Sequence, residues 1–214
     1  MRESHPSAEI VSCDFPRVCT SHAILPTDDH MTTDTKSAAQ MDELETYREG
    51  VETLLLLGSN RAISNGEPAH AAVIFEMFFK HAKERVAIFC KNLNRAVFDN
   101  DALTHQAAWA LTRGVMIDVI VQDENPDKSA FSDLLEKAKV KVRRAIGAAK
   151  SSPFNFAVMD KRAIRIESDR KKCEARAWMN APETASTLSR SFEHLAHPAA
   201  SPLFDPAMDG ASHI

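Results

Sequence analysis

The sequence predicts an α/β fold with a mixed β-sheet flanked by helices on both faces. Two patterns lead to this prediction. Between residues 71 and 138, short apolar runs typical of buried strands alternate with segments of helical spacing, which favours parallel strands joined by right-handed crossovers. Beyond residue 139 the apolar period changes to two. Successive strand-like segments then precede one last helical segment, an order that favours antiparallel or mixed pairing.

Helices are expected where apolar residues recur three and four positions apart. The first such segment carries Leu44, Tyr47 and Leu55 on its apolar face and stops near Gly58. A loop is expected next, because breakers and small polar residues follow closely: Asn60, Ser64, Asn65, Gly66 and Pro68. Further helices are expected over 71–82, 103–111, 131–138 and 185–195.

Strands are expected where apolar residues form short runs or alternate with polar ones. The expected strands cover 86–90, 115–121, 139–143, 154–159, 163–166 and 173–179. In the third of these, Val140 and Val142 alternate with Lys139, Lys141 and Arg143, so the charges share one face.

The chain divides into four parts by composition. Residues 1–40 and 198–214 are rich in small polar residues, Asp and Pro and show no apolar period, so both are expected to be disordered. Residues 41–68 supply an N-terminal helix and loop, and 69–197 supply the α/β domain.

The composition excludes several classes of protein. Of the 214 residues 44% are apolar, but no apolar run approaches the roughly 20 residues that span a bilayer. Charged residues such as Arg2 and Glu3 stand where a signal peptide would be apolar. The four Cys have neither metal nor disulfide spacing, and Cys90 and Cys173 are expected in the core. We expect a cytoplasmic protein without metal, cofactor or membrane association.

Basic residues are concentrated in one part of this acidic chain. Residues 137–176 hold 13 of the 26 Lys and Arg but 4 of the 30 Asp and Glu, although the chain has a net charge of −4. Such a stretch is typical of a polyanion-binding surface. It is also typical of edge strands on which lysines prevent sheet-to-sheet aggregation.

The segment from Pro153 to Ser168 resembles the motif of phospholipase D-like domains, His-x-Lys-x4-Asp-x6-Gly-Ser-x-x-Asn. Asp160 matches the motif Asp and Ser168 the motif Ser without a gap. The other positions depart from the motif: Pro153 replaces the His, Asn155 the Lys, Glu167 the Gly and Lys171 the Asn. The resemblance covers about residues 70–196 and implies a single domain of that family's fold.

The departures bear on the family's chemistry, in which a His attacks phosphorus and Lys and Asn hold the phosphate oxygens. Pro153 has no nucleophilic atom and Asn155 carries no charge, so we expect phosphodiesterase activity to be lost. Asp160 and Ser168 are then expected to have structural roles such as turn hydrogen bonds.

Three functions remain open at this stage. The first is nucleic-acid binding by a catalytically inactive domain, with the candidate phosphate contacts Lys141, Arg143, Arg144, Lys150, Arg165, Arg170, Lys171 and Lys172. The second is a structural or regulatory subunit that binds a protein partner or forms a homodimer through Trp178 and the last helix. The third is a residual hydrolase in which Asp160, Glu167, Asp169 and Glu174 hold a divalent cation. Glu174 is alternatively expected to pair with Arg165 or Arg176.

Overall fold

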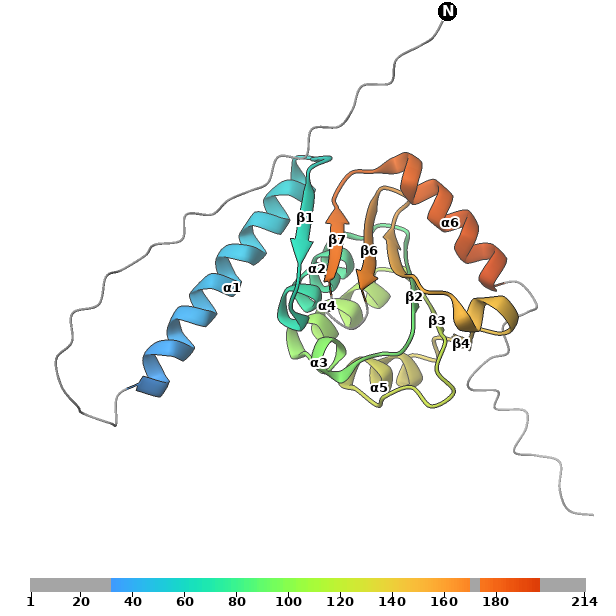
Figure 1. The fold of residues 1–214 in the computed structure, drawn as a ribbon, viewed down its shortest axis with the longest axis horizontal. Coiled ribbons are helices and arrows are strands. Elements are labelled where there is room, and N and C mark those ends of the chain that lie inside the picture. The colour runs from blue at the N-terminus through green and yellow to red at the C-terminus, as the bar shows by residue number, and fades with distance from the viewer. Residues whose placement is uncertain (1–31, 170–173, 197–214) are drawn as a thin grey trace, which may run out of the picture.

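The computed structural model describes the backbone of residues 32–169 and 174–196. In this part a seven-stranded sheet runs in the order β1-β7-β6-β5-β2-β3-β4 (Figure 1). The helices are α1 (Thr32–Leu56), α2 (Pro68–His81), α3 (Arg95–Phe98), α4 (Asp101–Thr112), α5 (Ala130–Lys137), the 3₁₀ helix η1 (Gly147–Ser151) and α6 (Pro182–Ala196). The strands are β1 (Ala62–Asn65), β2 (Arg85–Cys90), β3 (Met116–Val121), β4 (Val142–Arg144), β5 (Asn155–Met159), β6 (Ala163–Asp169) and β7 (Glu174–Trp178).

The sheet is mixed, as the order of elements predicts. β2, β3 and β4 pair in parallel and are joined by helical connections. β5, β6 and β7 form an antiparallel meander that joins this parallel part through the β2–β5 pair, and β1 pairs antiparallel with β7 at the far edge. The α/β fold class with helices on both faces is therefore confirmed.

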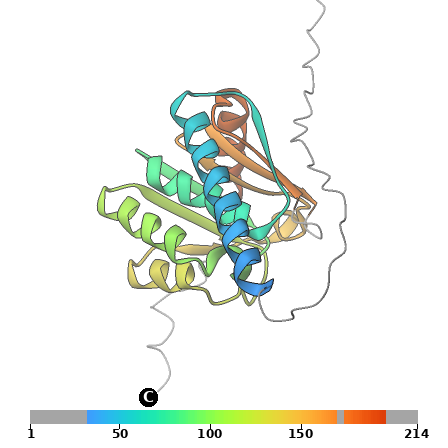
Figure 2. The same cartoon turned by 90° about the vertical axis from the view of Figure 1, so that its left-hand side faces the viewer.

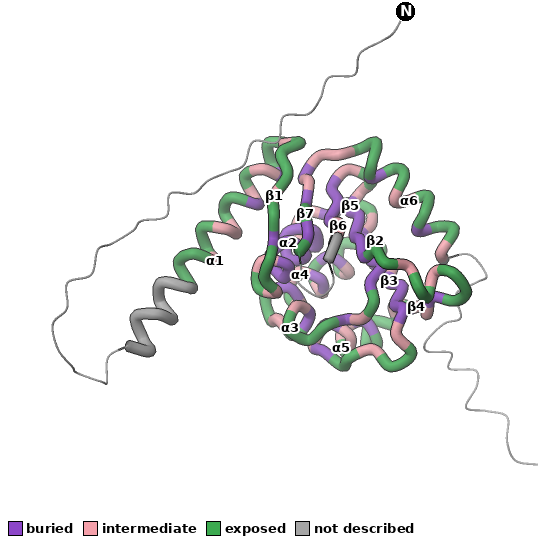
Figure 3. The backbone as a smooth tube through the Cα atoms, in the orientation of Figure 1, coloured by how far each residue is buried: buried purple, intermediate pink, exposed green. Residues whose placement is uncertain are grey.

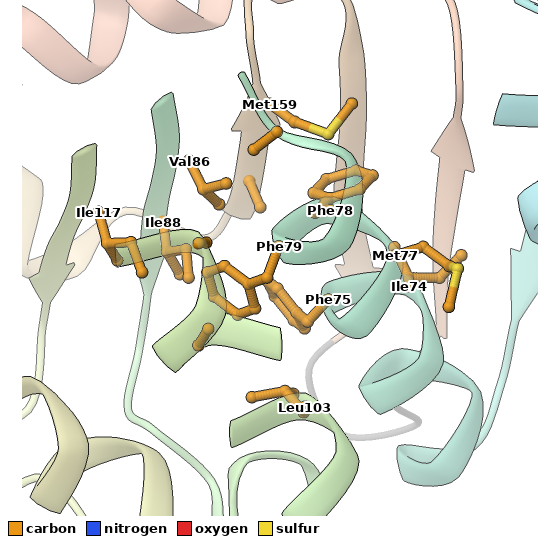
Figure 4. Close-up of a cluster of buried hydrophobic side chains, with 14 of the residues drawn as sticks. Ile74, Phe75, Met77, Phe78, Phe79, Val86, Ile88, Leu103, Ile117 and Met159 are labelled. Atoms are coloured by element: carbon orange, nitrogen blue, oxygen red, sulfur yellow. The ribbon is translucent and has the colours of Figure 1, made fainter. Parts of the chain in front are cut away.

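Each face of the sheet has its own apolar core. The larger core packs α1, α2, α4 and α5 against one face, and aromatic side chains of α2 such as Phe75 and Phe79 lie at its centre (Figure 4). The smaller core packs α6 against the other face through Ala185 and Phe192. In Figure 3 the central strands are accordingly coloured as buried along most of their length. Alternation in β2 assigns Ile88 to the first core and Phe89 to the second.

The N-terminal region differs from the expectation in two respects. α1 begins at Thr32, inside the segment expected to be disordered, whereas 1–31 and 198–214 lie outside the described residues. The expected loop after Gly58 contains a strand, because Ser64 and Asn65 pair with β7. α1 lies beside this edge of the sheet, as Figure 2 shows from the β1 side. None of the described helices is long and apolar enough to cross a membrane.

Candidate functional site

A cavity of about 250 Å³ lies where β2 ends and β5 begins. Its walls come from the first half of α2, the short helix α3, the end of β2, and facing positions of β5 and β6. Phe75 and Phe98, whose ring centroids lie 4.9 Å apart, form part of its apolar wall. Asn155, Arg165 and Glu167 form its polar side. Two of these, Asn155 and Glu167, are departures from the phospholipase D-like motif, so the cavity lies at the motif itself.

Asn155 joins three strands at this end of the sheet. Its side-chain oxygen accepts a hydrogen bond from the backbone N–H of Lys91, just beyond β2, at 2.9 Å. Its side-chain nitrogen donates to the Glu167 carboxylate, directly opposite in the β5–β6 register. Asn155 is 8% exposed, so both polar ends of its amide are satisfied within the protein.

Arg165 and Glu167 form a buried ion pair two positions apart on the same face of β6. Arg165 Nη2 lies 4.0 Å from Glu167 Oε1, and both side chains are largely buried. The guanidinium also lies 5.5 Å from the centroid of the Phe75 ring. When the Asn65 amide is oriented to pair both of its atoms, its oxygen accepts from Arg165 Nη2 at 3.2 Å. The buried guanidinium of Arg165 in the cavity wall is thus matched by a carboxylate.

Tyr47 connects α1 with this polar group. Burial raises the pKa of the Tyr47 phenol, and the nearby charge of Arg165 lowers it to a smaller extent. The Tyr47 hydroxyl is buried and has no hydrogen-bond partner among the described residues. Its ring stacks on His70 at the start of α2, with 4.2 Å between centroids. The hydroxyl is neutral at physiological pH and adds no charge to the site.

Pro153 is exposed in the loop that leads from η1 into β5. Gln122 directly follows β3, is 2% exposed and holds this loop by side-chain hydrogen bonds. The Gln122 side-chain nitrogen donates to the carbonyl oxygens of Ala149 and Ser152, at 2.8 and 2.9 Å. The ring of Pro153 offers neither a nucleophile nor a proton, and no other residue of the loop is a His or Lys between Ser151 and Asn155.

Asp160 lies at the opposite end of β5, in the turn to β6. Its carboxylate accepts three backbone N–H groups of the segment before β2, from Lys83 (2.8 Å), Glu84 (2.9 Å) and Arg85 (2.9 Å). Asp160 and Lys161 both have positive φ, 50° and 54°, a conformation that Asp tolerates better than most residues. The contacts of Asp160 therefore attach the β5–β6 turn to the segment that leads into β2. They also place the carboxylate away from the cavity.

The described members of the expected divalent-cation cluster do not come together, and the side chain of its fourth member, Asp169, lies outside the described residues. Asp160 and Glu167 lie at opposite ends of β6, and no group of three or more candidate ligands occurs among the described side chains. Glu174 is exposed on the face of β7 that also carries Arg176, whereas Arg165 shares the other face with Ala175 and Ala177. The expected Glu174–Arg165 pair is therefore wrong as well. The side chain of Ser168 and the whole of Lys171 lie outside the described residues.

The predicted phosphate contacts do not gather in one place. Arg165 is 6% exposed inside the α2 side of the sheet, which corrects its assignment to a binding surface. Arg143 lies on the opposite face under α6, where it and Arg85 both contact Asp118, at 3.4 and 2.6 Å. Arg170, Lys171 and Lys172 lie outside the described residues.

The remaining predicted contacts are at the surface near β4. Lys141 is exposed before β4, and Lys150 is exposed in η1. Lys150 Nζ pairs with Glu124 Oε1 at 2.5 Å, and Arg144 Nη2 donates to the Glu124 carbonyl at 2.7 Å. Lys150 lowers the pKa of the Glu124 carboxyl by hydrogen bonding and charge. Two cations therefore converge on one exposed acidic residue beyond the end of β3.

The two tryptophans occupy different environments. Trp178 is half-buried and packs against the smaller core under α6, so its indole contacts the domain's own side chains. Trp109 on α4 is 47% exposed and stacks on Arg113, whose guanidinium carbon lies 3.6 Å from the ring centroid. Arg113 in turn donates to three carbonyl oxygens at the end of α2, those of Phe79, Lys80 and Ala82. Sequence reasoning did not find this contact, because an Arg-Gly pair after a helix gives no sign of its partners.

No family model matches the chain, and no curated protein matches its sequence. Among solved structures, Nuc from Salmonella typhimurium, a phospholipase D family member, is 13% identical with a TM-score of 0.48, covering 66% of this chain and 95% of that one. NucT from Helicobacter pylori is 14% identical with a TM-score of 0.49, covering 66% and 99%. TrmBL2, an archaeal chromatin protein, is 14% identical with a TM-score of 0.48, covering 77% and 66%. At these identities, the similarity of the chain to these proteins concerns the fold alone.

Proposed function

We propose that this chain is a non-catalytic module of phospholipase D-like fold that binds the phosphates of nucleic acid beside its altered motif. The observation that carries the proposal is the Asn155–Glu167 pair, which occupies the polar side of the cavity and is satisfied within the protein. The experiment that tests it is salt-dependent binding, described below.

The atoms present at the motif support the proposed loss of hydrolysis. Cleavage of a phosphodiester through a covalent intermediate needs a nucleophile and a proton donor for the leaving oxygen. Pro153 supplies neither. The Glu167 carboxylate would repel a phosphate in the cavity, and repulsion between charges a few ångströms apart is stronger in a partly buried site than in water. Arg165 cannot offset this repulsion freely, because it is already paired with Glu167.

Phosphate binding at the rim is supported by cations around the same end of the sheet. Lys91 is exposed directly after β2, Arg144 ends β4, and Lys150 lies in η1. β2 and β4 run parallel with β3, so their carboxyl ends lie at one edge. The sequence adds three successive cations, at 170–172, between β6 and β7. Exposed ion pairs such as Lys150–Glu124 are weak, so a phosphate can replace Glu124 as the partner.

The test is fluorescence polarisation of the full chain with labelled DNA and RNA across a range of salt concentrations. We expect an affinity that falls steeply with salt, because bound cations release counterions from the nucleic acid. In the double variant Arg144→Glu, Lys150→Glu, the affinity should fall and the slope of log K against log salt should decrease by about 1.5 to 2. Lys83→Glu, at the opposite end of β2, is the matched control and should change neither value. Equal effects of the control and the double variant would contradict the proposed location.

A protein-binding role is the second candidate, and the Trp109–Arg113 stack favours it. Tryptophan and arginine dominate the binding energy of protein interfaces, and here the arginine is already fixed by three carbonyls. A partner protein or a second copy of the chain would therefore contact Trp109 and Arg113 in an arrangement that is already fixed before binding. Sedimentation velocity of the wild type and of Trp109→Ala over a wide concentration range tests the homodimer. A dimer that Trp109→Ala weakens supports this candidate, and a monomer at every concentration counts against self-association.

A further inference from the structure

An exposed aromatic side chain directly precedes Asn155 of the candidate site in the chain. Phe154, next to Pro153, is 57% exposed, although the strand it precedes is buried throughout. Large exposed apolar residues on a soluble protein are individually common. Phe154 differs because the backbone that carries it is fixed on both sides, so its ring is presented from a defined position.

Two buried amides hold that backbone. On one side Gln122 donates to the carbonyl oxygens of Ala149 and Ser152. On the other side Asn155 is fixed by Lys91 and Glu167. The Phe154 N–H itself donates to the Ser152 hydroxyl at 3.4 Å. A backbone held in this way loses little conformational entropy when a ligand contacts the side chain that it carries, and this preorganisation increases affinity.

The surroundings of Phe154 indicate the chemistry of such a ligand. Lys150 lies in η1, just before Phe154 in the chain, and the backbone of Lys91 bonds the side chain of Asn155. Arg144 ends β4 at the same end of the sheet, beyond β2 and β3. An exposed ring at the same end of the sheet as exposed cations suits single-stranded nucleic acid, since each base has a flat face for stacking and each phosphate a charge. Duplex bases already stack on each other and leave no face for Phe154.

We propose that Phe154 is the stacking platform for an unpaired base, so that the module prefers single-stranded over double-stranded nucleic acid. This inference rests on the proposed function, which supplies the phosphate contacts. It adds the class of nucleic acid and the residue that selects it. The ring supplies sequence-tolerant stacking and the flanking cations supply the salt-dependent part of the affinity.

The test compares Phe154→Ala and Phe154→Trp in the full chain, with unstructured oligo(dT) and a 20-base-pair duplex as probes. Phe154→Ala should weaken binding to the single strand about 5- to 100-fold and leave the duplex affinity and the salt slope unchanged. Phe154→Trp should bind the single strand with the affinity of the wild type. The tryptophan emission that this variant has in excess of the wild type should be quenched when the single strand binds. Met116→Ala removes another exposed apolar side chain, 58% exposed at the start of β3, and is the control that should bind as the wild type does.

The outcomes separate this inference from the proposed function. If Phe154→Ala binds both probes as the wild type does while Arg144→Glu, Lys150→Glu weakens both, the stacking role is overturned and phosphate binding stands. If Phe154→Ala weakens both probes equally, the strand preference is overturned. If the wild type binds neither probe at low salt, the proposed function fails and the stacking inference fails with it. Far-ultraviolet circular dichroism confirms that each variant is folded.

Discussion

Removal of the Asp160 side chain should destabilise the fold without affecting any ligand. The carboxylate accepts three backbone N–H groups, two at Oδ1 and one at Oδ2, and so joins the β5–β6 turn to the segment before β2. Hydrogen bonds to a charged acceptor contribute about 1.5 kcal/mol or more each when protected from water. Partial exposure of Lys83 and Glu84 reduces this value, so we expect Asp160→Ala to cost about 3 kcal/mol in the free energy of unfolding.

Asp160→Asn gives a sharper comparison. Its amide oxygen can keep the bonds from Glu84 and Arg85, while its amide nitrogen meets the Lys83 N–H and loses that bond. Asn also tolerates the positive φ of this position. The cost of Asp160→Asn should therefore be about 1 kcal/mol, clearly below that of Asp160→Ala.

Urea denaturation followed by circular dichroism measures both costs, and thermal melting should show a shift of about 2 to 4 °C per kcal/mol for a domain of this size. Equal costs for the two variants would refute the assignment of three hydrogen bonds. A cost below about 0.5 kcal/mol for Asp160→Ala would refute the structural role altogether.

Two further predictions concern α2. Hydrogen bonds from Lys80 and His81, together with their charges, lower the pKa of Glu52 below the ordinary glutamate value of 4.5. The stability from these pairs is therefore present above pH 4.5 and is lost as the pH falls through the folded-state pKa. Urea midpoints measured down to pH 3 should fall less in Glu52→Gln than in the wild type, and parallel curves would contradict the linkage. Arg113→Lys should lower the free energy of unfolding by about 1 to 2 kcal/mol, because a lysine cannot reach the three α2 carbonyls together. An unchanged urea midpoint would contradict this anchoring.

The central strands and the covering helices could be predicted because strands buried on both faces are short and mostly apolar. β2 and β3 are such runs, and the buried part of α2 is continuous from Ala71 to Phe79. β1 escaped prediction for the opposite reason. It is short, largely exposed and pairs with one strand, so its residues Ala62–Asn65 resemble a loop. Edge strands of this kind have little apolar signal to detect.

The candidate site was predicted in part. Two altered motif positions, Asn155 and Glu167, line a cavity, but their pairing depends on the register of β5 and β6, which a single sequence leaves open. Alternation showed that Arg165 and Glu167 share a face, but it did not show which face lies under α2. Arg165 was therefore assigned to a surface although it is buried. One signal of burial was available in the sequence. Arg165 and Glu167 lie two positions apart in a strand expected to be central, so they can pair with each other on a buried face.

The most direct test of the central claim measures binding and cleavage on the same sample. The full-length wild type is incubated with a labelled single-stranded oligonucleotide, its polarisation is recorded across salt, and the oligonucleotide is then analysed on a denaturing gel. We predict binding at low salt that weakens steeply as salt increases, with the oligonucleotide recovered intact. Cleavage of the oligonucleotide that remains after the chain has been purified further would contradict the account. The absence of binding at low salt would contradict it as well.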